Sequence, residues 1–196
     1  MGLRRTAEPV ADAITIHTAK KQCEIGVSDS THDTHLHRLI TAAVRDVERF
    51  TRRSLITQTW QLTNSCFPLW EIALPRPPFQ SITSIQYVDD NGTTQTLSSS
   101  LYQVDGSSPA LVCPAFNQSW PASRSLTANA VTITYVAGYG ADSTTIPPEF
   151  VNLVAELVAF RFMNRGDVQA SIPDHIMWAM KSLRCGAMYG CYGVKR

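Results

Sequence analysis

The sequence predicts an α+β protein, an antiparallel helical bundle formed by N- and C-terminal helices with an inserted, mostly antiparallel β domain. Apolar residues recur at spacings of three and four in Leu36–Phe50, and eleven of the fifteen residues of Phe150–Asn164 are apolar, which are patterns of packed helices. Between these stretches the apolar period changes to two, as in half-buried strands. The expected divisions are residues 1–54 and 147–184 for the helical domain, 55–146 for the β domain and 185–196 for a C-terminal tail.

Size and composition restrict the class of protein. A chain of 196 residues is long enough for one full-sized core, or for a helical domain with a smaller β insert. With 44% hydrophobic and 17% charged residues and a net charge of +1, it has too little basicity for a free-standing nucleic-acid binder. Any contact with DNA is therefore expected to be weak and independent of sequence.

Cysteine usage and the first residues indicate a cytoplasmic origin. The five cysteines are scattered and form no CxxC pair, which favours reduced thiols. Residues Met1–Ala11 carry two arginines but no apolar run behind them, unlike a signal peptide. We therefore expect the protein to stay in the cytoplasm where it is made.

Two helices are predicted before residue 55. Ile14–Ile25 has the spacing of a short helix, with Thr15 as its cap. Ser30 followed three residues later by Asp33 resembles a capping box, which would open a long helix reaching about Arg53. Its apolar face is expected to be core, and its opposite face to be solvated and to consist of Arg45, Glu48, Arg49 and Arg52.

The stretch Leu74–Leu97 reads as a β-hairpin. Its approach is held extended by Pro75, Pro77 and Pro78. The β-branched and aromatic residues of Ile82–Val88 favour a strand, Asp89–Gly92 favours a turn, and Thr93–Leu97 returns as the partner strand. The other candidate strands are Leu55–Leu62, Trp70–Leu74, Leu101–Val104, Ala110–Cys113 and Ala130–Val136.

Helical period resumes after the β region. Gly138–Gly140 is expected to end the last strand, and Pro147 with Pro148 to start a helix. The stretch Phe150–Asn164 is apolar on nearly every side yet too short to span a bilayer, so its expected partner is the long N-terminal helix. A final helix is predicted from Pro173 to about Arg184.

The densest group of potential metal ligands consists of His32, Asp33, His35 and His37. Asp33 and His37 have the i, i+4 spacing that can share a cation, but no further ligands stand at a recognisable spacing. An exposed first helical turn is the preferred interpretation, with no metal and no cofactor. The sequence also contains no GxSxG, HExxH or paired-carboxylate pattern, so catalysis is not expected.

Apolar surface is expected near the C-terminus. Of the four tryptophans, Trp60, Trp70 and Trp120 are expected in the core and Trp178 at an interface. The segment Pro173–Arg196 offers adaptable apolar side chains, while Gly186, Gly190 and Gly193 prevent it from forming a core of its own. It is therefore predicted to dock on a partner and to be poorly ordered beforehand; a solvated terminus is the alternative.

Several passages in a fixed order resemble one known family. They are Ile16-x-x-Ala19-Lys20, Val47-Glu48, Thr51 to Trp60, Leu74-Pro75-Arg76-Pro77-Pro78 continuing through Ile85, Tyr87, Val88, Asp89 and Gly92, then Trp120-Pro121, Gly138-Tyr139-Gly140, Pro147 and Asn164-Arg165. Together they are similar to the head-tail connector (head-completion adaptor) proteins of tailed phages, in the version with a β domain inserted between helices. The resemblance covers most of the chain and ends after Arg184.

The resemblance implies a structural role. Such proteins form a ring under the portal, extend the DNA channel and join the filled head to the next neck or tail component. It implies as partners the portal protein, a downstream stopper or tail terminator, other copies in a twelvefold ring and non-specific double-stranded DNA, with no membrane. The expected location is the head-tail interface of the virion. A tail-tube or baseplate component and a small soluble enzyme are the alternatives.

The predicted docking segment is, on this reading, the part that binds the portal. The residues expected at that contact are Trp178, Met180, Met188, Tyr189, Tyr192, Lys195 and Arg196.

Overall fold

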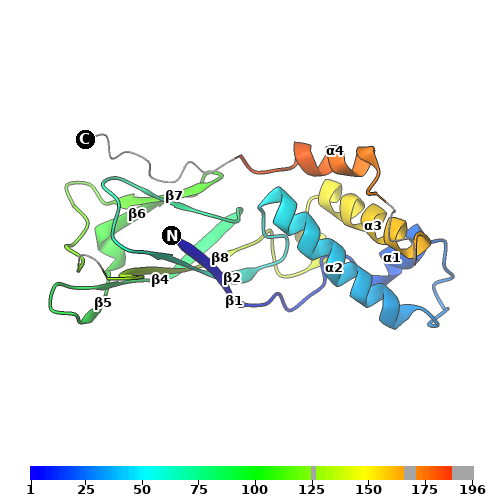
Figure 1. Ribbon diagram of the computed structural model, residues 1–196, viewed down its shortest axis with the longest axis horizontal. Coiled ribbons are helices and arrows are strands. Elements are labelled where there is room, and N and C mark those ends of the chain that lie inside the picture. The colour runs from blue at the N-terminus through cyan, green and yellow to red at the C-terminus, as the bar shows by residue number, and fades with distance from the viewer. Residues whose placement is uncertain (125–126, 166–170, 187–196) are drawn as a thin grey trace. The chain divides into compact units, whose positions relative to one another are not determined.

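The computed structural model describes residues 1–124, 127–165 and 171–186 and divides into two compact units (Figure 1). A helical unit comprises Pro9–Thr57 and Tyr139–Cys185, and a β unit consists mainly of Met1–Glu8 and Gln58–Gly138. The mixed helices and antiparallel sheets confirm the α+β class. The unit boundaries differ from the expected ones at the start of the chain, because the first residues form a strand of the β unit.

In its described residues the helical unit contains four α-helices. They are α1 (Ile16–Gln22), α2 (Asp33–Thr51), α3 (Pro148–Met163) and α4 (Asp174–Ser182). Helix α2 packs against α3, and both also contact α1 and α4. Helix α3 buries Phe150, Leu153, Val154, Ala155, Leu157, Val158, Ala159 and Phe162. The predicted pairing of the apolar C-terminal helix with the long N-terminal helix is therefore confirmed.

The predictions of how α1 and α2 begin are correct in part. The Thr15 hydroxyl accepts a hydrogen bond from the Thr18 N–H at 3.1 Å, which confirms the cap of α1. The capping box of α2 is wrong: the helix begins at Asp33, and His32, at its N-cap, makes no side-chain capping bond. The Asp33 carboxylate instead lies 2.6 Å from Nζ of Lys20, a buried ammonium. A charged partner from α1 thus outcompetes the local cap.

The helical pattern also predicts the wrong environment for Glu48. It is not on the solvated face but buried, and its Oε1 accepts a hydrogen bond from the Leu55 N–H at 2.8 Å. The helix ends at Thr51, and Arg52 takes a left-handed conformation with φ of 58°. This reversal brings the following backbone to the Glu48 carboxylate, which satisfies an N–H group that would otherwise be buried without a partner.

Across the part of the β unit that the structure describes, the strands form two antiparallel sheets. The five-stranded sheet has the order β1-β2-β8-β4-β5, and the three-stranded sheet has the order β3-β7-β6. The strands are β1 (Gly2–Ala7), β2 (Gln58–Asn64), β3 (Ile72–Leu74), β4 (Phe79–Val88), β5 (Thr94–Thr96), β6 (Tyr102–Asp105), β7 (Ala110–Pro114) and β8 (Val131–Ala137). Each predicted strand is present with shifted ends, and β1 is additional.

The predicted hairpin is β4 and β5. Gln86, Tyr87 and Val88 pair with Thr96, Gln95 and Thr94. In the turn, Asp89 Oδ1 accepts hydrogen bonds from the N–H groups of Asn91 and Thr93, and Gly92 has φ of 83°. A short acceptor side chain and a residue that tolerates positive φ fix this turn.

The β unit has its own core. Alternate residues of β2 and β8 point into it, including Trp60, Leu62, Ile133 and Tyr135. The fully buried Tyr135 side chain donates its hydroxyl hydrogen to the Pro75 carbonyl at 2.6 Å. The apolar clusters of the two units share no residue among those described.

The two segments of the helical unit that flank the inserted residues 58–138 lie side by side. Here the Thr57 N–H donates to the Gly140 carbonyl at 2.8 Å, and the Tyr139 N–H donates to the Leu55 carbonyl at 3.0 Å. Ile56 and Gly140 thus form a parallel bridge directly after β8 ends at Ala137. A side chain at position 140 would collide with Thr145, so glycine permits this close approach. The prediction of a strand-ending turn is confirmed.

Within the described ranges, none of the helices combines the length and apolarity that crossing a bilayer requires.

Candidate assembly surfaces

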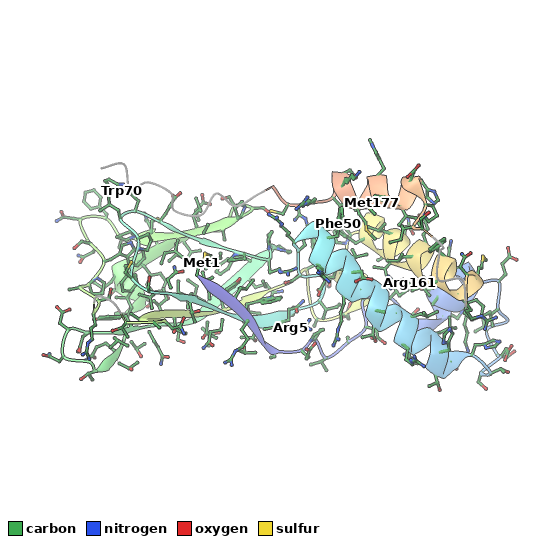
Figure 2. The ribbon with its side chains drawn as sticks, viewed as in Figure 1. Met1, Arg5, Phe50, Trp70, Arg161 and Met177 are labelled. Atoms are coloured by element: carbon green, nitrogen blue, oxygen red, sulfur yellow. The ribbon has the colours of Figure 1, made fainter. Side chains whose placement is uncertain are left out.

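Helix α4 presents apolar surface on one side while the other side is anchored. Trp178 is 73% exposed and Met177, labelled in Figure 2, is half-buried. Ile176 and Met180 lie in the core of the helical unit. The expectation that Met180 contributes to a docking surface is therefore wrong, because helical spacing places it opposite Trp178. A partner could reach the indole ring without disturbing the core.

The remaining residues expected at this contact cannot be placed. Met188, Tyr189, Tyr192, Lys195 and Arg196 lie outside the described residues. The chain is anchored up to Cys185, whose N–H donates to the Thr51 carbonyl at 2.8 Å and whose side chain is buried. Any removal of the tail that is meant to preserve the helical unit must therefore begin after this residue.

A second exposed tryptophan lies on the loop before β3. Trp70 is 76% exposed and its neighbour Leu69 is 79% exposed, so the expectation that Trp70 is a core residue is wrong (Figure 2). Trp120 holds the loop, because its Nε1–H donates to the Trp70 carbonyl at 3.2 Å and its ring stacks on Phe67 at 4.9 Å. The backbone is thus fixed while the Trp70 ring faces solvent.

The exposed face of α2 is basic. Arg38, Arg45, Arg49 and Arg52 are all exposed along it. Asp46, on the same helix, forms an ion pair with Arg161 of α3, which Figure 2 labels. An open groove of about 600 Å³ runs along the N-terminal half of this face and is lined by His35, Arg38, Leu39, Thr41, Ala42, Arg45 and Asp46.

The histidine-rich start of α2 brings no common ligand site together. Asp33 is directed to Lys20, and His37 Nδ1 lies 3.5 Å from a carboxylate oxygen of Asp12. The rings of His32 and His35 contact Phe162, with centroid distances of 5.4 and 6.1 Å. The part of the chain that the structure describes contains no group of three or more His, Cys, Asp or Glu residues placed to hold a metal ion.

Shifted pKa values reflect packing and turns in these units. Burial raises the pKa of the Cys23 thiol, which disfavours the reactive thiolate. Burial also raises the pKa of Tyr135 and of Tyr139. Hydrogen bonds from Gln95 and Thr93 lower the pKa of Asp89 in the hairpin turn. These titratable groups therefore belong to a core or a turn. The exposed surfaces of α4, of the Trp70 loop and of α2 are the ones suited to binding a partner.

Several solved structures are similar to this one over nearly the whole chain. The chain shares its fold with chains of gene transfer agent particles. A chain in the neck of an empty particle, computed with C6 symmetry, matches with a TM-score of 0.81 at 20% identity, covering 97% of this chain and 100% of the other. A chain in the virion of the native particle matches with a TM-score of 0.79 at 20% identity, over 97% and 98%.

A third match comes from the neck of the native particle, computed with C12 symmetry. Its TM-score is 0.73 at 19% identity, and it covers 97% of this chain and 100% of the other. No protein family and no curated protein sequence matches. At this level of identity the likeness establishes the fold, which here extends over both units.

Proposed function

We propose that the protein is a structural adaptor of a phage neck. Its copies form a ring under the portal that extends the DNA channel and joins the filled head to the next neck or tail component. The observation that carries this proposal is the full-length likeness to chains in particle necks. In the proposed architecture the helices of the helical unit form an antiparallel bundle, and the β domain is inserted between them.

The proposed partners follow from this position. They are the portal protein above, a stopper or tail terminator below, neighbouring copies in the ring and double-stranded DNA in the channel. A dodecamer is supported by the neck computed with C12 symmetry. The protein is active as a scaffold rather than as an enzyme, and it resides at the head-tail interface of the virion after assembly in the host cytoplasm.

The proposed portal contact is the exposed side of α4 with the tail after it. Exposed aromatic side chains on a well-anchored helix are typical of the centres of protein interfaces. Trp178 supplies such a side chain, and it stands on a helix that Ile176 and Met180 fix to the core. The tail residues Met188, Tyr189, Tyr192, Lys195 and Arg196 are proposed to extend the same contact.

The experiment is association of the purified protein with portal rings. The isolated protein should elute as a monomer or small oligomer and should co-elute with the portal as a ring. Trp178→Ala should weaken binding by at least tenfold, since aromatic anchors contribute about 2 kcal/mol or more. Removal of residues 187–196 should do the same.

Trp70→Ala is the matched control, because it removes an equally exposed indole from the β unit. It should leave portal binding unchanged. Failure of the unmodified protein to associate with portal rings would contradict the adaptor proposal. Equal weakening by the two tryptophan variants would contradict only the assignment of the contact to α4.

A further inference from the structure

The first eight residues belong to a different unit from the residues that follow them. We call Met1–Glu8 the N-terminal arm: it is part of the β unit, whereas the chain from Pro9 to Thr57 is part of the helical unit. The arm contains β1, which is the edge strand of the five-stranded sheet and has β2 as its neighbour. The arm is therefore an element that the chain delivers to the β unit from outside it.

The arm is held on β2 by main-chain pairing and by polar side chains. Arg4 Nη2 donates to Oε1 of Gln61 at 3.1 Å. Arg5 Nη1 donates to Oε1 of Gln58 at 3.0 Å. A second copy of this chain carries the same β unit, so any contact that the arm makes with its own β unit is available in identical form on a neighbouring copy.

The arm adds no side chain to the core of the β unit. Within β1 only Arg5 is half-buried. The large apolar side chains of residues 1–10, which are Met1, Leu3 and Val10, are all exposed. Detaching β1 thus costs mainly its pairing with β2, and pairing with another β2 returns that energy. The exposed apolar side chains gain further if a neighbouring copy covers them.

A short hinge of residues 9–11 connects the arm to the helical unit. It contains no helix or strand, and Val10 within it is fully exposed. Directly after it, Ala13 and Ile14 are buried in the core of the helical unit, which fixes the chain there. The hinge is therefore the segment whose backbone can change while both units keep their structure.

The length of the hinge limits how far the arm can be redirected. Four Cα–Cα steps separate Asp12 from Glu8, so Glu8 can lie anywhere within about 14 Å of Asp12. An arm redirected in this way can reach a β2 strand only on a copy that is in direct contact with its own.

We propose that the N-terminal arm exchanges between copies and joins them, with β1 of one subunit paired to β2 of the next. A single copy keeps the arm on its own β2, as in the structure. In the ring of the proposed function, on which this inference rests, a neighbouring β2 is held close at high effective concentration. The donated strand and the accepting edge are different surfaces, so the contact is head-to-tail and can close a ring.

The test is a disulfide between Arg4→Cys and Gln61→Cys, two positions that stand opposite each other in β1 and β2. Opposed residues of antiparallel strands have Cα atoms about 4.5 to 5.5 Å apart, which a disulfide can bridge. Cys66, Cys113 and Cys191 are first replaced with Ser, and the two buried cysteines are kept.

The oxidised products report which copy each arm occupies. The double variant, oxidised as isolated protein, should form an intrachain disulfide and run as a monomer on a non-reducing gel. Oxidised after assembly on portal rings, it should form a ladder of covalent multimers. Copies that carry only Arg4→Cys, mixed before assembly with copies that carry only Gln61→Cys, should form disulfide-linked dimers.

The matched control pairs Gln61→Cys with Thr134→Cys, which stand opposite each other in β2 and β8. Both strands lie within residues 58–138 of the β unit, so this disulfide should be intrachain before and after assembly. Multimers of the control at the same yield would show that neighbouring copies merely collide, and would overturn the proposal. Assembled rings in which the Arg4→Cys and Gln61→Cys pair forms only intrachain disulfides would overturn it as well.

Locking the arm before assembly measures what the exchange contributes. The double variant oxidised as isolated protein cannot donate its arm. Its rings should dissociate from one another at least about tenfold faster than rings of the same variant kept reduced, an effect of about 1.4 kcal/mol. Dithiothreitol should restore the slow rate, which excludes damage to the fold. Equal rates for locked and reduced protein would contradict the claim that the arm joins copies.

The same samples separate this inference from the proposed function. Portal rings that carry bound protein with only intrachain disulfides keep the adaptor role and exclude the exchange. Mixed single variants that form linked dimers in concentrated solution, while the protein ignores portal rings, keep the exchange and exclude the adaptor role.

Discussion

The ion pair between Lys20 and Asp33 is asymmetric, and this asymmetry predicts how each residue responds to mutation. The Lys20 side chain is 6% exposed and the Asp33 side chain 34% exposed. Asp33→Asn leaves a buried ammonium whose hydrogen bond to the Val27 carbonyl, at 3.2 Å, carries no balancing charge, and it should cost roughly 3 kcal/mol of unfolding free energy. Lys20→Met leaves a carboxylate that water can reach and should cost about 1 kcal/mol.

Urea denaturation of both single variants and of the double variant measures this difference. The double variant should be more stable than Asp33→Asn alone, because no buried charge is left without its partner. If Lys20→Met proves the more damaging single change, the buried ammonium is not the dominant cost.

Tyr135 predicts a loss of stability in alkali. Burial raises its folded-state pKa, so the neutral phenol is favoured in the folded protein and the phenolate only in the unfolded chain. The stabilisation is therefore complete below the ordinary tyrosine pKa near 10 and declines above it. The slope for one such group is about 1.4 kcal/mol per pH unit.

Tyr135→Phe separates the two contributions of this side chain. At pH 8 it should cost about 1 kcal/mol, through the lost hydrogen bond to the Pro75 carbonyl. Above pH 10 its stability should fall less steeply than that of the unmodified protein. Urea titrations at pH 8 and at several values above 10 give both quantities, and parallel curves above pH 10 would refute the prediction.

Among the elements, β1 is held by its backbone pairing with β2 and by side-chain hydrogen bonds from Arg4, Arg5 and Thr6 to that strand. Of its residues only Arg5 is even half-buried, and the strand contributes nothing to the core. It does, however, cover the outer edge of β2. Deleting residues 1–7 should therefore leave a folded protein whose β2 edge is open to pairing with other chains.

Light scattering and size-exclusion chromatography should show concentration-dependent self-association of this truncated protein. Replacement of Arg4 alone with Gln is the control, since it removes a charge and keeps both the backbone pairing of β1 and the contact of Arg5 with Gln58. A truncated protein that remains monodisperse at concentrations where the control does would contradict the proposed covering role of β1.

Sequence predicts those elements whose side chains carry a burial pattern. The alternation in Ile82–Val88 and the apolar run of Phe150–Asn164 arise because each element packs against a core. The pattern therefore predicts both the type of each element and its packing partner. Strand β1 has no such pattern, because main-chain pairing and polar side chains hold it on β2. Asp33 and Glu48 match the local rules for a cap and a solvated face, but tertiary partners, Lys20 and the Leu55 N–H, take precedence.

The candidate surfaces, too, can be predicted from sequence only where a local pattern encodes them. The spacing of Arg45, Arg49 and Arg52 places them on the exposed face of α2, as predicted. The pairing of Asp46 with Arg161 is a contact between distant residues that no local pattern encodes. Trp70 is exposed although its size suggests a core residue, because Trp120 fixes the backbone and leaves the Trp70 ring outside.

For the whole molecule, the separate cores predict that the helical unit can fold without residues 58–138. Thr57 and Tyr139 lie on adjacent, hydrogen-bonded segments, so a linker of about six glycine and serine residues can join them. The shortened protein should show a helical circular-dichroism spectrum and a cooperative thermal transition.

Introducing Leu157→Ala into the shortened protein checks that its own core is responsible. This buried residue of α3 should contribute about 3 kcal/mol in the shortened and in the full-length protein. A shortened protein that lacks cooperative unfolding would show that the helical unit depends on the β unit.

The parallel bridge between Ile56 and Gly140 has a mechanical consequence. In parallel segments the chain exits one at its C-terminal end and enters the other at its N-terminal end, so tension on the two connections pulls them in opposite directions along a shared axis. The hydrogen bonds from Thr57 and Tyr139 are then loaded in shear and resist together, instead of opening one after the other. Single-molecule pulling across this junction should reveal a force peak that Thr57→Pro, which removes one donor, lowers.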